Sequence, residues 1–137
     1  MPTHRHLPDE LSRWSVQALT RLFATYAIAQ GVIIVMGGAE RWRGAALAVA
    51  MQVPGAPATW GIALGVFGAL ALAGTFLVRL RLTALALWLI GAWCMFFAIS
   101  QFLVVVNDPN AGTTGIGTYT VLAIAASVLA VTYRRAG

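Results

Sequence analysis

The sequence has few charged residues. They make up 9% of the 137-residue chain, whereas hydrophobic residues make up 60%. A soluble globular domain carries about 25% charged residues, so this composition cannot cover a water-facing surface. Lysine is absent, since all nine basic residues are arginine. These shortages exclude a soluble globular domain and indicate an integral membrane protein.

Residue types that carry chemistry are also scarce. The interiors of the long apolar stretches contain no Asp, Glu, Lys, Arg or His, although such residues usually mark function within a membrane. No phosphate-binding glycine loop or nucleophile–base pair is recognisable. The single cysteine, Cys94, can form no intramolecular disulfide and is expected to act as a small apolar side chain. We therefore expect no enzyme activity, no catalytic residues and no cofactor.

Metal and nucleic-acid sites are not expected either. His4 and His6 flank Arg5 near the N-terminus, but no third ligand accompanies them. The arginines are spread over the edges of the apolar stretches, whereas a nucleic-acid site needs a basic stripe on one face. The sequence therefore predicts neither a metal site nor a nucleic-acid partner.

Long apolar stretches dominate the chain. Four of them cover approximately residues 22–38, 60–78, 82–106 and 116–133. Each is about as long as the ~17–25 residues that a helix needs to cross the hydrocarbon core of a membrane. We therefore predict an all-α fold in which residues 1–137 form one membrane domain, a four-helix transmembrane bundle.

The segment before the first stretch is amphipathic. Between residues 9 and 21, apolar side chains recur at helical spacing and polar ones occupy the opposite face. Asp9 is of a type that caps helix starts. This pattern predicts an interfacial helix over residues 9–21 on the inner membrane surface, which bends or runs directly into the first transmembrane helix. No signal-peptide pattern precedes it, so we expect the first apolar stretch to remain in the mature protein.

The arginines indicate an orientation, because Arg is enriched in the cytoplasmic segments of membrane proteins. Only two of the arginines, Arg41 and Arg43, lie in the loops after the first and third stretches. The two ends of the chain and the hinge at residues 79–81 hold Arg5, Arg13, Arg21, Arg79, Arg81, Arg134 and Arg135. We therefore expect a multi-pass protein of the bacterial inner (cytoplasmic) membrane with both termini cytoplasmic. The expected cytoplasmic anchors are Arg21, Arg79, Arg81, Arg134 and Arg135.

Small residues recur every four positions in the second stretch, at Gly61, Gly65, Ala69 and Ala73. Helices approach one another closely in lipid through small residues at this spacing. The pattern favours an internal contact with another helix of the same chain, and a contact between copies is the alternative.

Polar side chains at depth are few, and the principal ones are Gln30, Ser100 and Gln101. Hydrogen bonding between helices is the simpler role for them. The alternative is that they line a wetted interface in an oligomer.

Residues 39–59 are expected to form an outer cap loop over the bundle. Trp42 and Trp60 suit the headgroup level of the membrane, and Pro54-Gly55 is a turn signal. Pro57 stiffens the approach to the second helix. The apolar residues 45–51 are too few to span, so we expect an interfacial helix or a shallow re-entrant segment. A gate or a partner-docking surface is the alternative role for this loop.

One part of the sequence resembles a known group of proteins. Residues 42–61 contain WRG, PGAP and WG and lead into a glycine-rich helix. This arrangement resembles small four-helix membrane proteins encoded by actinobacterial bacteriophages, some of which lie beside endolysin genes and are regarded as holins or holin-like proteins. The resemblance implies an oligomer that permeabilises the inner membrane for endolysin-mediated host cell lysis. The resemblance implies no catalytic residues that could be assigned to positions in this sequence.

Two other functions fit the same features. The protein is alternatively a small accessory or regulatory membrane protein, either a subunit of a larger complex or a superinfection-exclusion factor. A small oligomeric channel or transport protein is the third interpretation. The expected partners are the lipid bilayer, further copies of the chain and, for the accessory function, another membrane protein.

Overall fold

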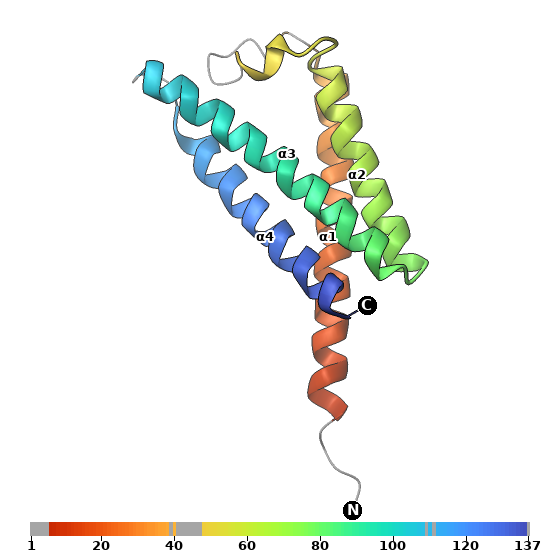
Figure 1. The fold of residues 1–137 in the computed structure, drawn as a ribbon. Coiled ribbons are helices and arrows are strands. Elements are labelled where there is room, and N and C mark those ends of the chain that lie inside the picture. The colour runs from red at the N-terminus through yellow and green to blue at the C-terminus, as the bar shows by residue number, and fades with distance from the viewer. Residues whose placement is uncertain (1–5, 39, 41–47, 109, 111, 137) are drawn as a thin grey trace, which may run out of the picture.

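A computed structural model describes residues 6–38, 40, 48–108, 110 and 112–136, with side chains from residue 13 onward. The described elements are helices α1 (His6–Gly37), α2 (Ala58–Phe76), α3 (Leu80–Asn107) and α4 (Thr114–Ala136), with a 3-10 turn, η3 (Ala50–Gln52), between α1 and α2 (Figure 1). Each of the four α-helices contains a segment long and apolar enough to cross a membrane. The described chain is therefore all-α, and its four apolar helices are compatible with a multi-pass membrane protein.

The predicted interfacial segment and the first predicted transmembrane helix form one continuous helix of 32 residues, α1. Neither glycine nor proline occurs between residues 9 and 30, so nothing in the sequence interrupts the helix there. Pro8 lies in the first turn, where its missing N–H costs no helical hydrogen bond. Gly38 follows the helix with a φ of +63°, the left-handed conformation in which helices commonly end.

The four helices form two pairs. α1 packs along α2, α3 packs along α4, and contacts between α2 and α3 join the pairs. In Figure 1 the α3–α4 pair is inclined to the α1–α2 pair. Because successive helices alternate in direction, the start of α1, the α2–α3 turn and the end of α4 lie toward the same end of the molecule.

Two apolar clusters hold the pairs together. The larger lies in the middle and includes Ala27 of α1, Leu64 of α2 and Phe97 of α3. The smaller joins α3 and α4 through Leu87 and Leu129. Many other large apolar side chains are exposed, among them Leu22, Ile33, Ile62, Leu85, Phe102 and Ile124. An apolar outer surface of this extent is what a hydrocarbon environment requires.

Candidate association surface and arginine end

The α1–α2 contact is built on glycine. A methyl group at Gly31 would lie 2.5 Å from the Gly61 carbonyl oxygen and 2.8 Å from the Gly65 nitrogen. A methyl group at Gly61 would lie 2.6 Å from the Gly31 carbonyl oxygen, and one at Gly68 would lie 2.8 Å from the Ala24 carbonyl oxygen. The backbones of α1 and α2 therefore approach too closely to leave room for side chains at these positions.

The structure divides the small residues predicted to share one face of α2. Gly61 is buried against α1, Gly65 is half-buried, Ala69 is exposed and Ala73 is half-buried. A spacing of four residues advances about 40° beyond one full turn of a helix, so each step rotates further from the first contact. The buried positions instead follow Gly61, Leu64, Gly68 and Ala71.

Two glycines of this contact, Gly31 and Gly68, were not singled out from the sequence. Gly68 follows Gly61 by seven residues, a spacing that keeps two positions on nearly the same helix face. That spacing is the signal that could have found it. Gly31 is the only glycine between residues 22 and 36, and only its packing against α2 reveals its role.

Gly65 borders an apolar groove on the outer side of the α1–α2 pair. Outside its own helix, no described atom would lie within 4 Å of a methyl group at Gly65. The groove has a volume of about 320 Å³. It is lined by Ile28, Gly31, Val32, Val35, Met36, Gly61, Ile62, Gly65 and Val66. We call this surface the Gly65 groove.

The polar residues predicted at depth do not form one site. Gln30 lines a narrow apolar pocket beside Trp93, and neither Ser100 nor Gln101 lines it. The Ser100 hydroxyl donates to the Phe96 carbonyl oxygen in its own helix at 2.8 Å. Gln101 is buried, and its side chain occupies the space in which Gly115 of α4 would place a methyl group. The three residues thus lie in separate surroundings.

The segment before α2 is tied to the bundle by Trp60. Its indole N–H donates to the Ala50 carbonyl oxygen at 2.7 Å, and its ring stacks on Phe96 with centroids 4.7 Å apart. Residues 53–56 form a turn closed by a hydrogen bond from the Ala56 N–H to the Val53 carbonyl oxygen, with Gly55 at a φ of +80°. Pro57 is buried.

Parts of the predicted cap loop lie outside the described residues. Trp42 is one of them, as are residues 45–47 of the apolar run at residues 45–51.

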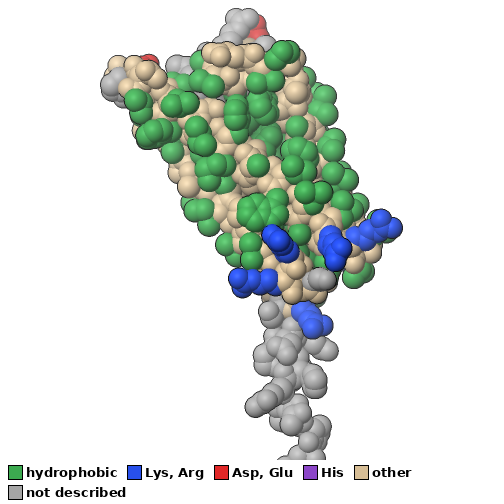
Figure 2. Space-filling model, in the orientation of Figure 1, with side chains coloured by type: hydrophobic (Ala, Val, Ile, Leu, Met, Phe, Trp, Pro, Cys, Tyr) green, Lys and Arg blue, Asp and Glu red, His purple; other side chains and the backbone are tan. Residues whose placement is uncertain are grey.

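The described arginines gather at one end of the molecule (Figure 2). They are Arg13, Arg21, Arg79, Arg81, Arg134 and Arg135, and all are exposed. The described acidic side chains, Glu40 and Asp108, follow the ends of α1 and α3 on the opposite side. Arg21 lies over the Phe76 ring, 4.8 Å from its centroid, which links α1 to the last residue of α2. We call this part of the molecule the arginine end.

Within the described residues, no three His, Cys, Asp or Glu side chains come together as a metal site requires. The features with functional potential are therefore the Gly65 groove, the buried polar side chains and the arginine end. No protein-family model, curated protein or solved structure matches the chain.

Proposed function

We propose that the protein is a holin-like protein of the bacterial cytoplasmic membrane, which associates with copies of itself and permeabilises that membrane for endolysin-mediated lysis. The observation that carries the proposal is the Gly65 groove, an apolar surface with open space at Gly65. A protein of this kind needs no catalytic site. It acts by accumulating in the membrane and associating through its helix faces.

The proposed orientation places the arginine end in the cytoplasm, because Arg-rich segments remain on that side. Both termini are then cytoplasmic. A helix of 32 residues such as α1 is about 48 Å long at ~1.5 Å per residue, which exceeds a hydrocarbon core of ~30 Å. The residues before Arg21 therefore extend into the inner headgroup region, and their amphipathic pattern suits that position.

The groove is suited to association in lipid. Apolar burial gives little driving force there, so helices associate through close packing at small residues. Gly61 and Gly68 are already used within the chain, whereas Gly65 faces open space. Ile62 and Val66 are exposed beside it. A helix of a second copy would pack across Gly65 with these side chains on either side.

The packing inside a single copy favours a lesion that forms between copies over a path through one copy. Two buried hydroxyls bond within their own helices: Thr20 donates to the Val16 carbonyl oxygen at 2.8 Å, and Ser100 to the Phe96 carbonyl oxygen at 2.8 Å. Side chains satisfied in this way need no water. The same observation favours a second candidate, a compact accessory membrane protein that docks on a larger partner without opening a path.

Expression in a bacterial host, with and without a co-expressed endolysin, tests the proposal. We expect abrupt lysis only when endolysin is present. Gly65→Leu fills the groove and should delay or abolish that lysis. Gly117→Leu is the matched control, because Gly117 of α4 also faces open space but lies outside the groove. Intact cells at high expression would overturn the proposal, and co-purification of a defined membrane partner would then favour the accessory function.

A further inference from the structure

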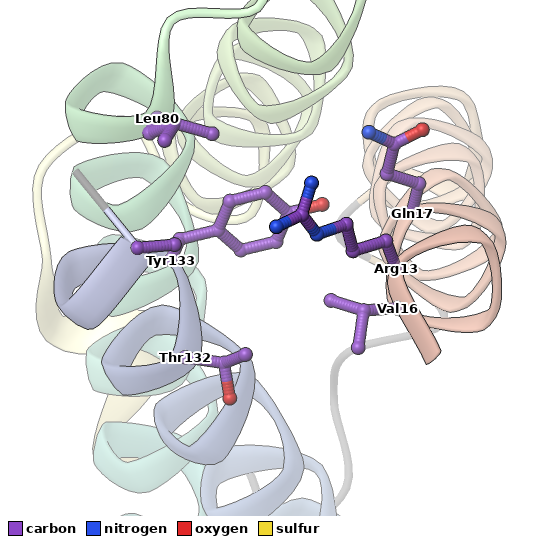
Figure 3. A pocket seen from close by; sticks show the side chains of 7 residues that line it. Arg13, Val16, Gln17, Leu80, Thr132 and Tyr133 are labelled. Atoms are coloured by element: carbon purple, nitrogen blue, oxygen red, sulfur yellow. The ribbon is translucent and has the colours of Figure 1, made fainter. Parts of the chain in front are cut away.

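A cavity of about 410 Å³ lies between α1 and the α3–α4 pair at the arginine end. Figure 3 shows its lining side chains: Arg13, Val16 and Gln17 from α1, Leu80 from α3, and Thr132 and Tyr133 from α4. Ala136 completes the lining. Polar side chains therefore line the cavity from both α1 and α4, and Val16, Leu80 and Ala136 make up its apolar lining.

The Tyr133 hydroxyl lacks a partner. The Tyr133 side chain is 6% exposed, and its oxygen makes no hydrogen bond within the described part of the chain. Figure 3 shows the ring extending from α4 toward α1, with the Arg13 guanidinium reaching toward the same space. A buried hydroxyl is unfavourable without a partner. Because the cation Arg13 lines the same cavity, an acceptor with negative charge suits the space that both side chains border.

The other side chains that line the cavity restrict which chemical group that acceptor could be. Arg13, Gln17 and Tyr133 all supply donors. The Thr132 hydroxyl already donates to the Val128 carbonyl oxygen at 2.9 Å. A guanidinium presents a planar pair of N–H groups that matches the oxygens of phosphate. The described carboxylates, Glu40 and Asp108, lie at the opposite end of the molecule, whereas Asp9 and Glu10 precede Arg13 by one turn of α1.

The geometry points to a binding site for the phosphate of an anionic phospholipid headgroup, held by Arg13, Gln17 and Tyr133. Basic pockets between helices on the cytoplasmic side of a membrane bind such headgroups. The apolar lining suits the glycerol and upper acyl carbons that accompany a lipid phosphate but not a free phosphate. This site rests on the membrane orientation proposed above and is independent of the lytic activity.

Native mass spectrometry of the purified full-length protein in detergent tests the site, with phosphatidylglycerol, phosphatidylcholine and inorganic phosphate as probes. We expect phosphatidylglycerol to be retained in preference to phosphatidylcholine. Arg13→Gln should weaken phosphatidylglycerol binding by about tenfold or more, as expected for a charged hydrogen bond, and Tyr133→Phe by about fivefold. Arg81→Gln is the matched control, because Arg81 lies at the same end but lines a different cavity with Trp88 and Arg134. It should change the affinity by less than about twofold.

Three results would overturn the site. The first is equal weakening by Arg13→Gln and Arg81→Gln, which indicates general attraction of an anion to a basic surface. The second is unchanged binding in Tyr133→Phe, a substitution that removes one hydroxyl and leaves the ring packing in place. The third is displacement of the lipid by millimolar inorganic phosphate, which indicates a soluble anion as the ligand. Because binding is measured in detergent, a failure of the lytic function does not affect the outcome.

Discussion

The Trp93 indole N–H donates to the Trp60 carbonyl oxygen at 3.2 Å, joining the middle of α3 to the first turn of α2. Trp60 in turn donates its own indole N–H to the Ala50 carbonyl oxygen. Phe97 stacks on Trp93 with centroids 4.2 Å apart and meets Trp60 edge-on at 5.4 Å. Through these contacts the two tryptophans connect α2, α3 and the segment that precedes α2.

Trp60→Phe should lower the free energy of unfolding by about 0.5–1.5 kcal/mol, because the ring stacking is retained while the Ala50 carbonyl oxygen loses its donor. Thermal or denaturant unfolding in detergent micelles measures this change. Trp88→Phe is the control, since Trp88 lies on the surface of α3 with 44% of its area exposed. An equal loss in both variants would contradict a specific role for the Trp60 indole.

Gly61→Ala should destabilise the protein by about 1–3 kcal/mol, the usual cost of forcing an extra carbon into a packed contact. The added methyl group would meet the Gly31 carbonyl oxygen and the Val35 side chain, at 2.6 and 2.7 Å. Gly65→Ala should leave stability within about 0.5 kcal/mol, because its methyl group faces the open groove. Melting temperatures of the two variants in the same detergent compare them directly. A larger loss for Gly65→Ala would contradict the assignment of these two glycines.

The contrast between these glycines shows how far the sequence could predict the structure. The number and approximate limits of the apolar helices can be predicted from the length and composition of the apolar stretches alone. A helix that crosses a hydrocarbon core must be both long enough and apolar. The packing partner of a glycine cannot be predicted in this way, because it depends on which helix lies against the glycine and on how the two helices are rotated about their axes. The hydrogen bond between Trp93 and Trp60 spans 33 residues of sequence and depends on how the two helix pairs are inclined. The proposed lipid site could not be predicted from the sequence either, because Arg13 and Tyr133 come from opposite ends of the chain and meet only through the packing of the helices.

The turn between α2 and α3 contains a conformation that its residue type disfavours. Val78 has a φ of +53°, and the Arg79 N–H reaches back to the Gly74 carbonyl oxygen at 2.9 Å. This helix ending normally uses glycine, because a β-branched residue fits the left-handed region poorly. Val78 is 73% exposed, so its removal costs little packing.

Val78→Gly should therefore raise the free energy of unfolding by about 1 kcal/mol, since a side chain in this conformation costs roughly 1–2 kcal/mol. Unfolding in detergent measures the gain. Val78→Ala should yield a smaller gain, because it removes the branch and keeps the β-carbon. A loss of stability in Val78→Gly would contradict strain at this turn.

Cysteine labelling tests the proposed orientation. Thr113→Cys, between α3 and α4, should react with a membrane-impermeant maleimide in intact cells, because the proposed orientation puts this loop on the outer side. Ala136→Cys, at the arginine end, should react only after the membrane is permeabilised. The native Cys94 is buried, so the unsubstituted protein should show little background. The reverse pattern of labelling would place the arginine end outside.

Membrane potential in cells that express the protein without endolysin is the most direct test of the holin-like function. A potential-sensitive dye should report an abrupt collapse for the wild type and for Gly117→Leu, and a sustained potential for Gly65→Leu at the same amount of membrane-inserted protein. A wild type that accumulates to high levels while the potential persists would contradict permeabilisation. A collapse in Gly65→Leu with wild-type timing would show that the Gly65 groove is not the surface through which copies associate.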